Sequence, residues 1–320
     1  MSSNNSAVNQ LNAATSIVVL VASAVHIISG AIGLTFNIFI FTRPTLRDEP
    51  SSLYFFSSTC FSLYLVYVAM PLRVLANSFN IDMTNYNLGL CKIANFSFYS
   101  ARSTSCWFIA LACADRFCHS SASAAIRRMS SIKIARWTVV ITSVTITLLY
   151  GHMVVYYEIT NVSDRFGNIT PLCNGRNGIY RTYLGFWYMV LYSLCPSFFM
   201  LLFGFLTLNN IRQRRQVVPT VARRNQLVRR TDNQLLRMLI AQVFVIIVAT
   251  LPLSVYQVYA AFTGNFSKST LHLAQENLAA RVVGVMTYFA HTSSFYLYTL
   301  AGTVFRKELR KIIGQCWNRN

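Results

Sequence analysis

The pattern of hydrophobic positions divides the chain into seven long apolar stretches separated by shorter polar segments. Each stretch has the length that a helix needs to cross the hydrocarbon core of a bilayer, about 20 residues. The sequence therefore predicts an all-α membrane protein, a bundle of seven transmembrane helices. The expected spans are residues 17–42, 51–76, 88–117, 132–157, 181–208, 234–262 and 279–303.

The composition and charge agree with lipid as the surrounding solvent. Mean hydropathy is +0.43, and charged residues make up 12% of the chain, about half the share found in a soluble domain. The net charge of +19 does not indicate a nucleic-acid partner, because 20 of the 28 Lys and Arg fall on one side of the expected membrane. The positive-inside rule assigns that side to the cytoplasm and the amino terminus to the outside.

This topology predicts three segments in a multi-pass protein of the plasma membrane. Residues 1–16 carry no charge and are expected to form an extracellular amino terminus. Residues 17–303 form the seven-transmembrane domain, and residues 304–320 form an amphipathic helix with a short cytoplasmic tail. The first apolar run is longer than the apolar core of a cleavable signal peptide, so we interpret it as a signal anchor.

Sequons for N-glycosylation give a separate indication of orientation. They consist of Asn-x-Ser/Thr, and glycans are added to them only on the outer side. A match at Asn95 lies inside the third span and is expected to be accidental. Four others fall on the side assigned to the outside: Asn4, Asn161, Asn168 and Asn265.

Two of the eight cysteines are placed to form a disulfide. Cys91 begins the third span on the outer side, and Cys173 lies in the outer loop before the fifth span. Because the outside is oxidising, these two form the expected disulfide. Five of the remaining cysteines lie in or at the ends of spans, where a cysteine serves as a small apolar residue.

The last cysteine, Cys316, lies in a segment with a different pattern. Apolar residues recur on one helical face of residues 305–317, with basic residues between them. This spacing predicts a short amphipathic eighth helix that lies along the inner membrane surface. Cys316 is a candidate for palmitoylation there, and the alternative is a free cytosolic thiol.

The charged pair Asp115-Arg116 ends the third apolar run. The 25 residues from Cys91 to Arg116 span about 37 Å of helix, which places the pair at the inner interface. Cys91 followed at this spacing by Asp115-Arg116-Phe117 resembles the rhodopsin-like (class A) family of G-protein-coupled receptors. Further matches to that family occur in chain order at Gly33 and Asn37, Trp137, Pro196, Pro252, and Tyr298 followed by Phe305-Arg306.

The resemblance implies a receptor that passes the binding of an extracellular ligand to a heterotrimeric G protein, without enzymatic activity or a cofactor. Arg116 then belongs to an inner switch with Asp115, Phe117 and Tyr298. Asp232 lies about 30 Å before Pro252 along the sixth helix and is expected to hold Arg116 in the resting state. The alternative is that Asp232 is a solvated acid near a helix amino terminus.

Several positions depart from the family pattern. Thr250 stands where the sixth helix usually has Trp, and Ser294-Phe295 stands where the seventh has Asn-Pro. Ser62 occupies the usual position of an acid in the second helix, so the sodium site of many relatives lacks this carboxylate here and the sequence leaves sodium binding open. These losses indicate a divergent branch, and the run "SFYLYTLAGTVFRKEL" resembles invertebrate neuropeptide receptors of the FMRFamide-like sort.

The outer half of the bundle is basic and aromatic. Its third helix has no acid of the kind that binds amine transmitters, and its seventh has no Lys for retinal. Arg102 lies about 16 Å below Cys91, and an Arg at that depth indicates a functional site. It is expected to meet a carboxylate or other acceptor of the ligand; the alternative is internal pairing with backbone carbonyls or Glu276. The expected pocket residues are Arg73, Phe98, Tyr99, Arg102, Tyr256, Gln257, Arg281 and Tyr288.

Two other classes of protein share a multispan architecture. A membrane transporter is the main alternative, but it predicts internal repeats and mid-span charged pairs, which are not evident. An intramembrane enzyme would need a nucleophile or metal motif, and the histidines in the spans are isolated, so no metal site is expected. No Ser, Thr or Tyr follows Phe305, so any arrestin would have to bind through the inner loops.

Overall fold

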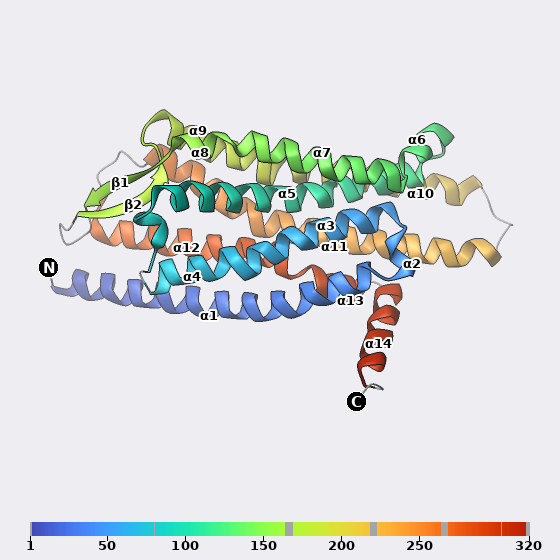
Figure 1. The fold of residues 1–320 in the computed structure, drawn as a ribbon, viewed down its shortest axis with the longest axis horizontal. Helices are drawn as coiled ribbons and strands as arrows, with labels where there is room; N and C mark the ends of the chain where they lie inside the picture. Colours follow the sequence, from blue (N-terminus) through green and yellow to red (C-terminus); the bar gives the residue numbers. More distant parts are fainter. Residues whose placement is uncertain are drawn as a thin grey trace.

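The computed structural model describes residues 2–79, 81–163, 169–217, 223–263, 268–301 and 303–317. Long helices run side by side in one bundle (Figure 1), and the predicted seven-helix architecture is confirmed. The seven passages in chain order are α1 (Ser2–Phe41); α3 (Pro50–Tyr64) with α4 (Met70–Ser78); α5 (Leu88–Ser120); α7 (Ile132–Tyr150) with α8 (His152–Tyr156); α9 (Ile179–Tyr188) with α10 (Cys195–Val217); α11 (Arg223–Thr263); and α12 (Thr270–Thr292) with α13 (Ser294–Ala301).

The two ends of the bundle carry different short elements (Figure 1). The amino terminus and an antiparallel hairpin, β1 (Tyr157–Ser163) and β2 (Ile169–Gly175), lie at one end, which we call the hairpin end. The opposite end, called the Arg116 end, carries three short helices. They are α2 (Pro44–Arg47), α6 (Ala124–Met129) and α14 (Thr303–Trp317), the last of which turns away from the bundle axis.

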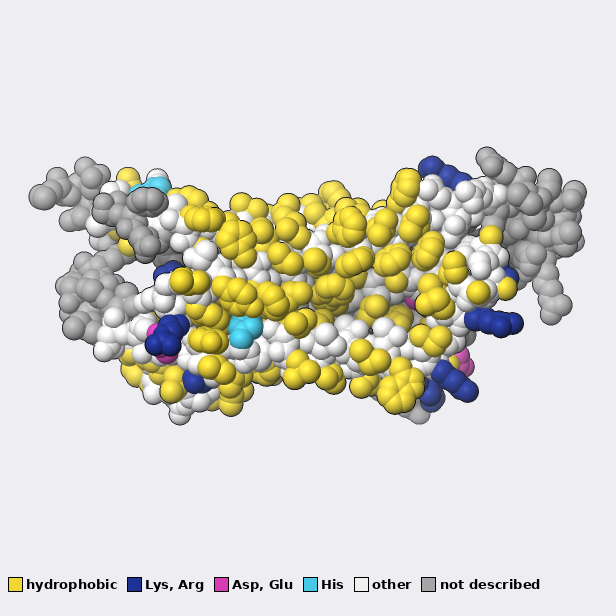
Figure 2. Space-filling model, turned by 90° about the horizontal axis from the view of Figure 1, so that it is seen from above, with side chains coloured by type: hydrophobic (Ala, Val, Ile, Leu, Met, Phe, Trp, Pro, Cys, Tyr) yellow, Lys and Arg dark blue, Asp and Glu magenta, His cyan; other side chains and the backbone are white. Residues whose placement is uncertain are grey.

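Apolar surface covers the middle of the bundle. Figure 2 shows hydrophobic side chains over the central part of one face, with Lys and Arg toward its ends. Within the described residues, five segments are long and apolar enough to cross a membrane on composition alone: Ser6–Phe41, Pro50–Ala76, Ile132–Tyr156, Ile179–Gln213 and Leu239–Thr263. The central helix α5 has a more polar sequence because it buries polar residues in the bundle, including Arg102, Ser103 and Thr104.

Three helices begin well before their apolar runs. The first starts at Ser2 rather than at residue 17, the sixth at Arg223 rather than at residue 234, and the seventh at Thr270 rather than at residue 279. Hydropathy marks the part of a helix that prefers lipid, whereas the backbone hydrogen bonds of a helix continue through polar sequence as well. The predicted limits mark the apolar parts of these passages, and the helices continue beyond them.

Two passages change their winding close to a proline. Residues Leu65–Ala69 form a π-helical turn shortly before Pro71, and Met189–Leu194 form another before Pro196. Proline lacks a backbone N–H, and its ring clashes with the carbonyl four residues earlier. A wider turn accommodates this conflict without ending the helix.

The first helix packs closely against the seventh. A Cβ atom added to Gly33 would lie 2.9 Å from the Cβ of Phe295, so a larger residue would push the two helices apart. One turn further along α1, the Asn37 amide donates a hydrogen bond of 3.1 Å to the Ser294 hydroxyl. Gly33 and Asn37, noted above for their spacing, thus fix the position of α13.

The structure contains the predicted disulfide. Cys91 at the start of α5 is bonded to Cys173 of β2, and the two are separated by 82 residues. In the hairpin, Ile159 of β1 lies opposite Cys173. The disulfide therefore holds the whole hairpin against the end of the central helix.

Removal of this disulfide is expected to destabilise the fold. A crosslink over a loop this long restricts the unfolded chain, and its loss costs about 2–5 kcal/mol. We expect Cys91→Ala/Cys173→Ala to unfold at a lower temperature than the parent in a thermal scan. The exposed free thiol Cys60 provides the control: Cys60→Ala should leave the midpoint unchanged. Equal midpoints for both variants would contradict the stabilising role.

The sequons differ in accessibility. Asn161 lies exposed on β1, whereas Asn95 is buried and its amide donates to the Cys91 carbonyl at 2.9 Å. The side chain of Asn4, and Asn168 and Asn265, lie outside the described residues.

Glycan mapping is expected to follow this difference. The Asn161→Gln variant should migrate faster on a gel, by the apparent mass of one glycan. The reason is that the exposed side chain of Asn161 is accessible for glycosylation. Ser97→Ala, which removes the sequon at Asn95 while keeping the asparagine, should not change mobility. The measurement is a gel-shift assay with and without endoglycosidase, and a shift caused by Ser97→Ala would overturn the prediction.

Candidate functional site

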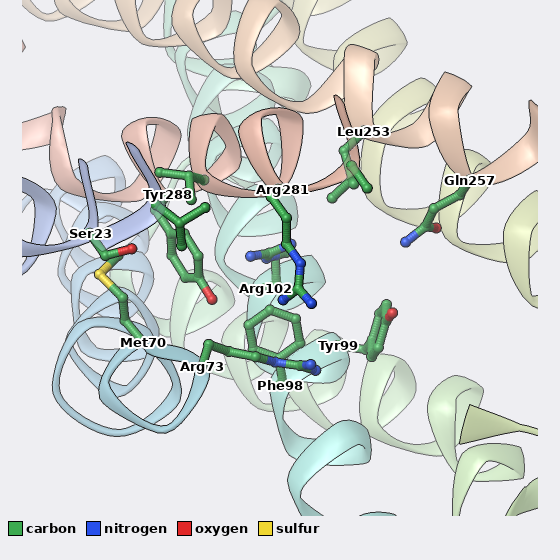
Figure 3. Close-up of a pocket in the computed structure, with 14 residues that line it drawn as sticks. Ser23, Met70, Arg73, Phe98, Tyr99, Arg102, Leu253, Gln257, Arg281 and Tyr288 are labelled. Carbon is green, nitrogen blue, oxygen red and sulfur yellow. The ribbon is translucent and has the colours of Figure 1, made fainter. Parts of the chain in front are cut away.

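A cavity of about 180 Å³ lies in the hairpin half of the bundle, between α1, α4, α5, α11 and α12. Figure 3 shows side chains from several helices turned toward it. Arg73 extends from α4, Arg102 from α5 and Arg281 from α12, so three separate passages each contribute a guanidinium group. No carboxylate occurs among the residues that the structure places around this cavity.

Seven of the eight expected pocket residues line this cavity. The exception is Tyr256. Leu253 and Gln257, four residues apart on α11, turn toward the cavity, and Tyr256 is rotated by about 100° from Gln257 around the helix. Sequence reasoning missed Val19, Ser23, Met70, Leu253, Ala280, Gly284 and Val285.

Arg102 is enclosed by aromatic side chains. It is 3% exposed, and one terminal nitrogen donates a hydrogen bond of 3.0 Å to the Tyr188 hydroxyl. Its guanidinium carbon lies 4.2 Å from the centre of the Phe98 ring and 4.9 Å from that of Tyr288. Such contacts between a cation and ring faces contribute about 0.5–2 kcal/mol each. Within the described residues, the buried Nε of Arg102 has no hydrogen-bond partner.

The other two arginines are oriented by amide groups. Arg73 donates to the side-chain oxygen of Asn95 at 3.0 Å and lies 4.9 Å from the Phe98 ring centre. Arg281 donates through Nε to the side-chain oxygen of Asn277 at 3.3 Å. The ring of Phe98 thus contacts both Arg73 and Arg102.

Glu276, considered above as an internal partner of Arg102, bonds to other groups. Its carboxylate accepts hydrogen bonds from Lys268 at 2.6 and 2.8 Å and from the Tyr259 hydroxyl at 2.7 Å. His272 lies 3.2 Å from the same carboxylate. This cluster links the hairpin-end portions of α11 and α12.

Hydroxyl groups occupy the middle of the bundle. The Ser105 hydroxyl is hydrogen-bonded to those of Ser58 and Ser62, at 2.9 and 3.0 Å. Beside them is a cavity of only about 10 Å³, about the space of one water molecule. Its described lining offers hydroxyl, amide and imidazole groups but no carboxylate. Thr250, which replaces the usual Trp, is hydrogen-bonded to Ser193 at 3.2 Å.

The second candidate site is the charged pair at the Arg116 end. Asp115 accepts hydrogen bonds from the hydroxyl of Ser51 and, at 2.7 Å, from that of Ser130. Arg116 forms an ion pair of 3.7 Å with Glu49, the residue before Pro50 at the start of α3. Arg116 is 5% exposed and Glu49 is half exposed. Sequence reasoning missed Glu49.

The remaining expected switch residues are distributed over this half. Phe117 packs against Phe203 of α10, with ring centres 5.8 Å apart. Tyr298 is buried, and its ring centre lies 5.1 Å from that of Phe55. Among the described residues, no hydrogen bond joins Tyr298 to Asp115 or Arg116. The backbone of Asp232 lies in α11, but its side chain, like that of Cys316, is outside the described part of the chain.

The histidines are dispersed. His26 is hydrogen-bonded to Thr292, His152 to Tyr180, and His291 to Tyr192. Across the described residues, no group of three His, Cys, Asp or Glu could hold a metal ion. The arginines that are buried in the described part of the chain are Arg102 and Arg116, one in each candidate site.

A protein-family model matches most of the chain. The family model described as 7 transmembrane receptor (rhodopsin family) matches residues 35–296. This range extends from the last turns of α1 to α13 and includes the arginines of both sites. No curated protein matches the chain significantly.

Proposed function

The chain belongs to the rhodopsin family of seven-transmembrane receptors, and from this premise we propose that it converts the binding of an extracellular neuropeptide into activation of a heterotrimeric G protein. The hairpin end and the amino terminus face the outside of the plasma membrane, and the Arg116 end with α14 faces the cytoplasm. The excess of Lys and Arg at the Arg116 end supports this orientation.

The observation that carries the ligand proposal is the cavity around Arg102. A guanidinium group this deep in a membrane protein is costly unless it is paired or has a function. Its neighbours Phe98, Tyr288 and Tyr188 provide aromatic contacts, and no carboxylate in the described lining could receive an amine. A peptide offers carbonyl oxygens and acidic side chains, so it fits this set better than a monoamine does.

The switch proposal rests on the opposite end. Arg116 has an ion-pair partner in Glu49, and Asp232 is proposed as a further partner on the sixth helix. Breaking such contacts would release Arg116 toward a G protein and bias a two-state equilibrium. Asp115 stays bonded to Ser51 and Ser130, which connects the switch to α3 and to the loop after α6. Arrestin would bind through these inner loops, and palmitoylation of Cys316 would anchor α14.

Ligand potency tests the role of Arg102. Arg102→Gln removes the charge and should raise the agonist concentration needed for half-maximal guanine-nucleotide exchange by about tenfold or more, since a charged hydrogen bond contributes about 1.5–3 kcal/mol. The agonist is taken from a peptide-library screen with a second-messenger readout.

Exposed Arg181 on α9 supplies the matched control, and surface expression is measured for both variants. If the agonist is equally potent on the Arg102→Gln variant at normal surface expression, the proposal that Arg102 contacts the ligand is contradicted. Substrate flux without nucleotide exchange would indicate a transporter instead.

Basal activity tests the contact between Arg116 and Glu49. Glu49→Gln should raise ligand-independent nucleotide exchange, because one restraint on Arg116 is lost. Because Glu49 is half exposed, water screens this ion pair, and such a pair contributes about 0.2–1 kcal/mol, so the rise should be at most roughly fivefold. Asp48→Asn is the control, since Asp48 is an exposed acid in the same loop. A rise of the same size in both variants would mean that loop charge, rather than this ion pair, sets basal activity.

A further inference from the structure

Three arginines share one cavity, and the groups that orient them are uncharged. Arg102 bonds to the phenol of Tyr188, Arg73 to the amide of Asn95, and Arg281 to the amide of Asn277. A phenol or an amide oxygen fixes the direction of a guanidinium group without cancelling its charge. The three positive charges are therefore held in position but are not neutralised by these partners.

The surroundings offer little further compensation. The carboxylate of Glu276 is already bonded to Lys268 and lies beside His272, and no acid is among the described residues that line the cavity. The ring of Phe98 faces two of the guanidinium groups, but a ring quadrupole stabilises a cation without carrying a net charge.

Such an arrangement has an electrostatic cost when the cavity holds no anion. Like charges repel more strongly where protein and lipid replace water, and buried charges in proteins are usually paired or bound to an ion. A positively charged cleft with low-dielectric walls also concentrates the field on any anion that enters. A ligand that supplies negative charge offsets the repulsion between the arginines, and this relief adds to its binding free energy.

The size of the cavity limits what enters it. Sites that enclose a whole drug-sized ligand measure about 300–1,000 Å³, whereas this cavity is about 180 Å³. It has room for one group of a ligand, with the remainder of the molecule toward the hairpin end. Guanidinium groups bind carboxylate and phosphate oxygens in paired, planar contacts.

We propose that this cavity binds a ligand group carrying two or more negative charges, either a phosphate or two neighbouring carboxylates such as adjacent acidic side chains of a peptide. This inference rests on the proposed function, because it specifies the ligand chemistry of the same site. Arg102 forms the base of the anion site, and Arg73 and Arg281 contact the anion from the second and seventh helices.

Thermal unfolding of the purified full-length protein in nanodiscs tests the proposal with simple anions as probes. Inorganic phosphate, citrate and acetate are compared with chloride at equal ionic strength. At about ten times the dissociation constant, phosphate or citrate should raise the midpoint by about 2–4 °C, while acetate should not. Phosphate alone would identify a phosphate group, and citrate alone would identify clustered carboxylates; either result supports the multiply charged class.

Variants separate binding from general salt effects on stability. Arg73→Gln and Arg281→Gln should each lose most of the shift. Arg281→Lys, which keeps the charge, should retain part of it, and Arg181→Gln, outside the cavity, should retain all of it. Equal shifts with acetate and phosphate, or a full shift in both Gln variants, would overturn the proposal.

The assay is independent of G-protein coupling. If anions raise the unfolding midpoint but no ligand stimulates nucleotide exchange, the anion site is supported and the proposed signalling function is contradicted. If a peptide stimulates nucleotide exchange but no anion raises the unfolding midpoint, the receptor function is supported and the proposal of a multiply charged ligand group is contradicted.

Discussion

The cost of burying charge in a low-dielectric bundle determines how this protein is organised. Only 12% of its residues are charged, and of the charged side chains buried in the described part of the chain, all except Glu308 lie at two positions along α5. Arg102 lies among aromatic rings in one half, and Asp115 with Arg116 lies at the opposite end. Each group is stabilised by contacts from other helices, because an isolated buried charge is strongly unfavourable. These contacts make α5 the helix that connects both sites.

The two sites are stabilised by different chemistry. Around Arg102 the contacts are aromatic faces and a phenol, which stabilise a cation and leave its charge available. At the Arg116 end, serine hydroxyls bond to Asp115 and a carboxylate pairs with Arg116. The first arrangement favours an incoming anion, whereas the second satisfies its charges within the chain. This difference is what is expected of a binding site at one end and a restrained switch at the other.

Sequence alone predicted the bundle and most of the candidate site, for identifiable reasons. Apolar runs show which segments prefer lipid, and the spacing from Cys91 located Arg102 and Arg116 along α5 because the rise of a helix is constant. Helix rotation was less accessible: Tyr256 was expected in the cavity, but Leu253 and Gln257 turn toward it. Val19 and Ser23 were missed because the first helix carries no charge or motif at these positions. Glu49 was missed because its contact with Arg116 depends on how the loop after α1 folds.

The π-helical turn at Met189–Leu194 has a consequence for the rotational phase of the fifth helix. Tyr188 lies just before the turn and Tyr192 lies within it, and their rings stack with centres 4.7 Å apart. Both approach Arg102. One residue of α-helix corresponds to about 100° of rotation, and a π turn absorbs one extra residue. The segment toward the hairpin is therefore offset in phase from the segment after Pro196, so the regular α-helical spacing does not relate the residues that face the bundle before the turn to those that face it afterwards.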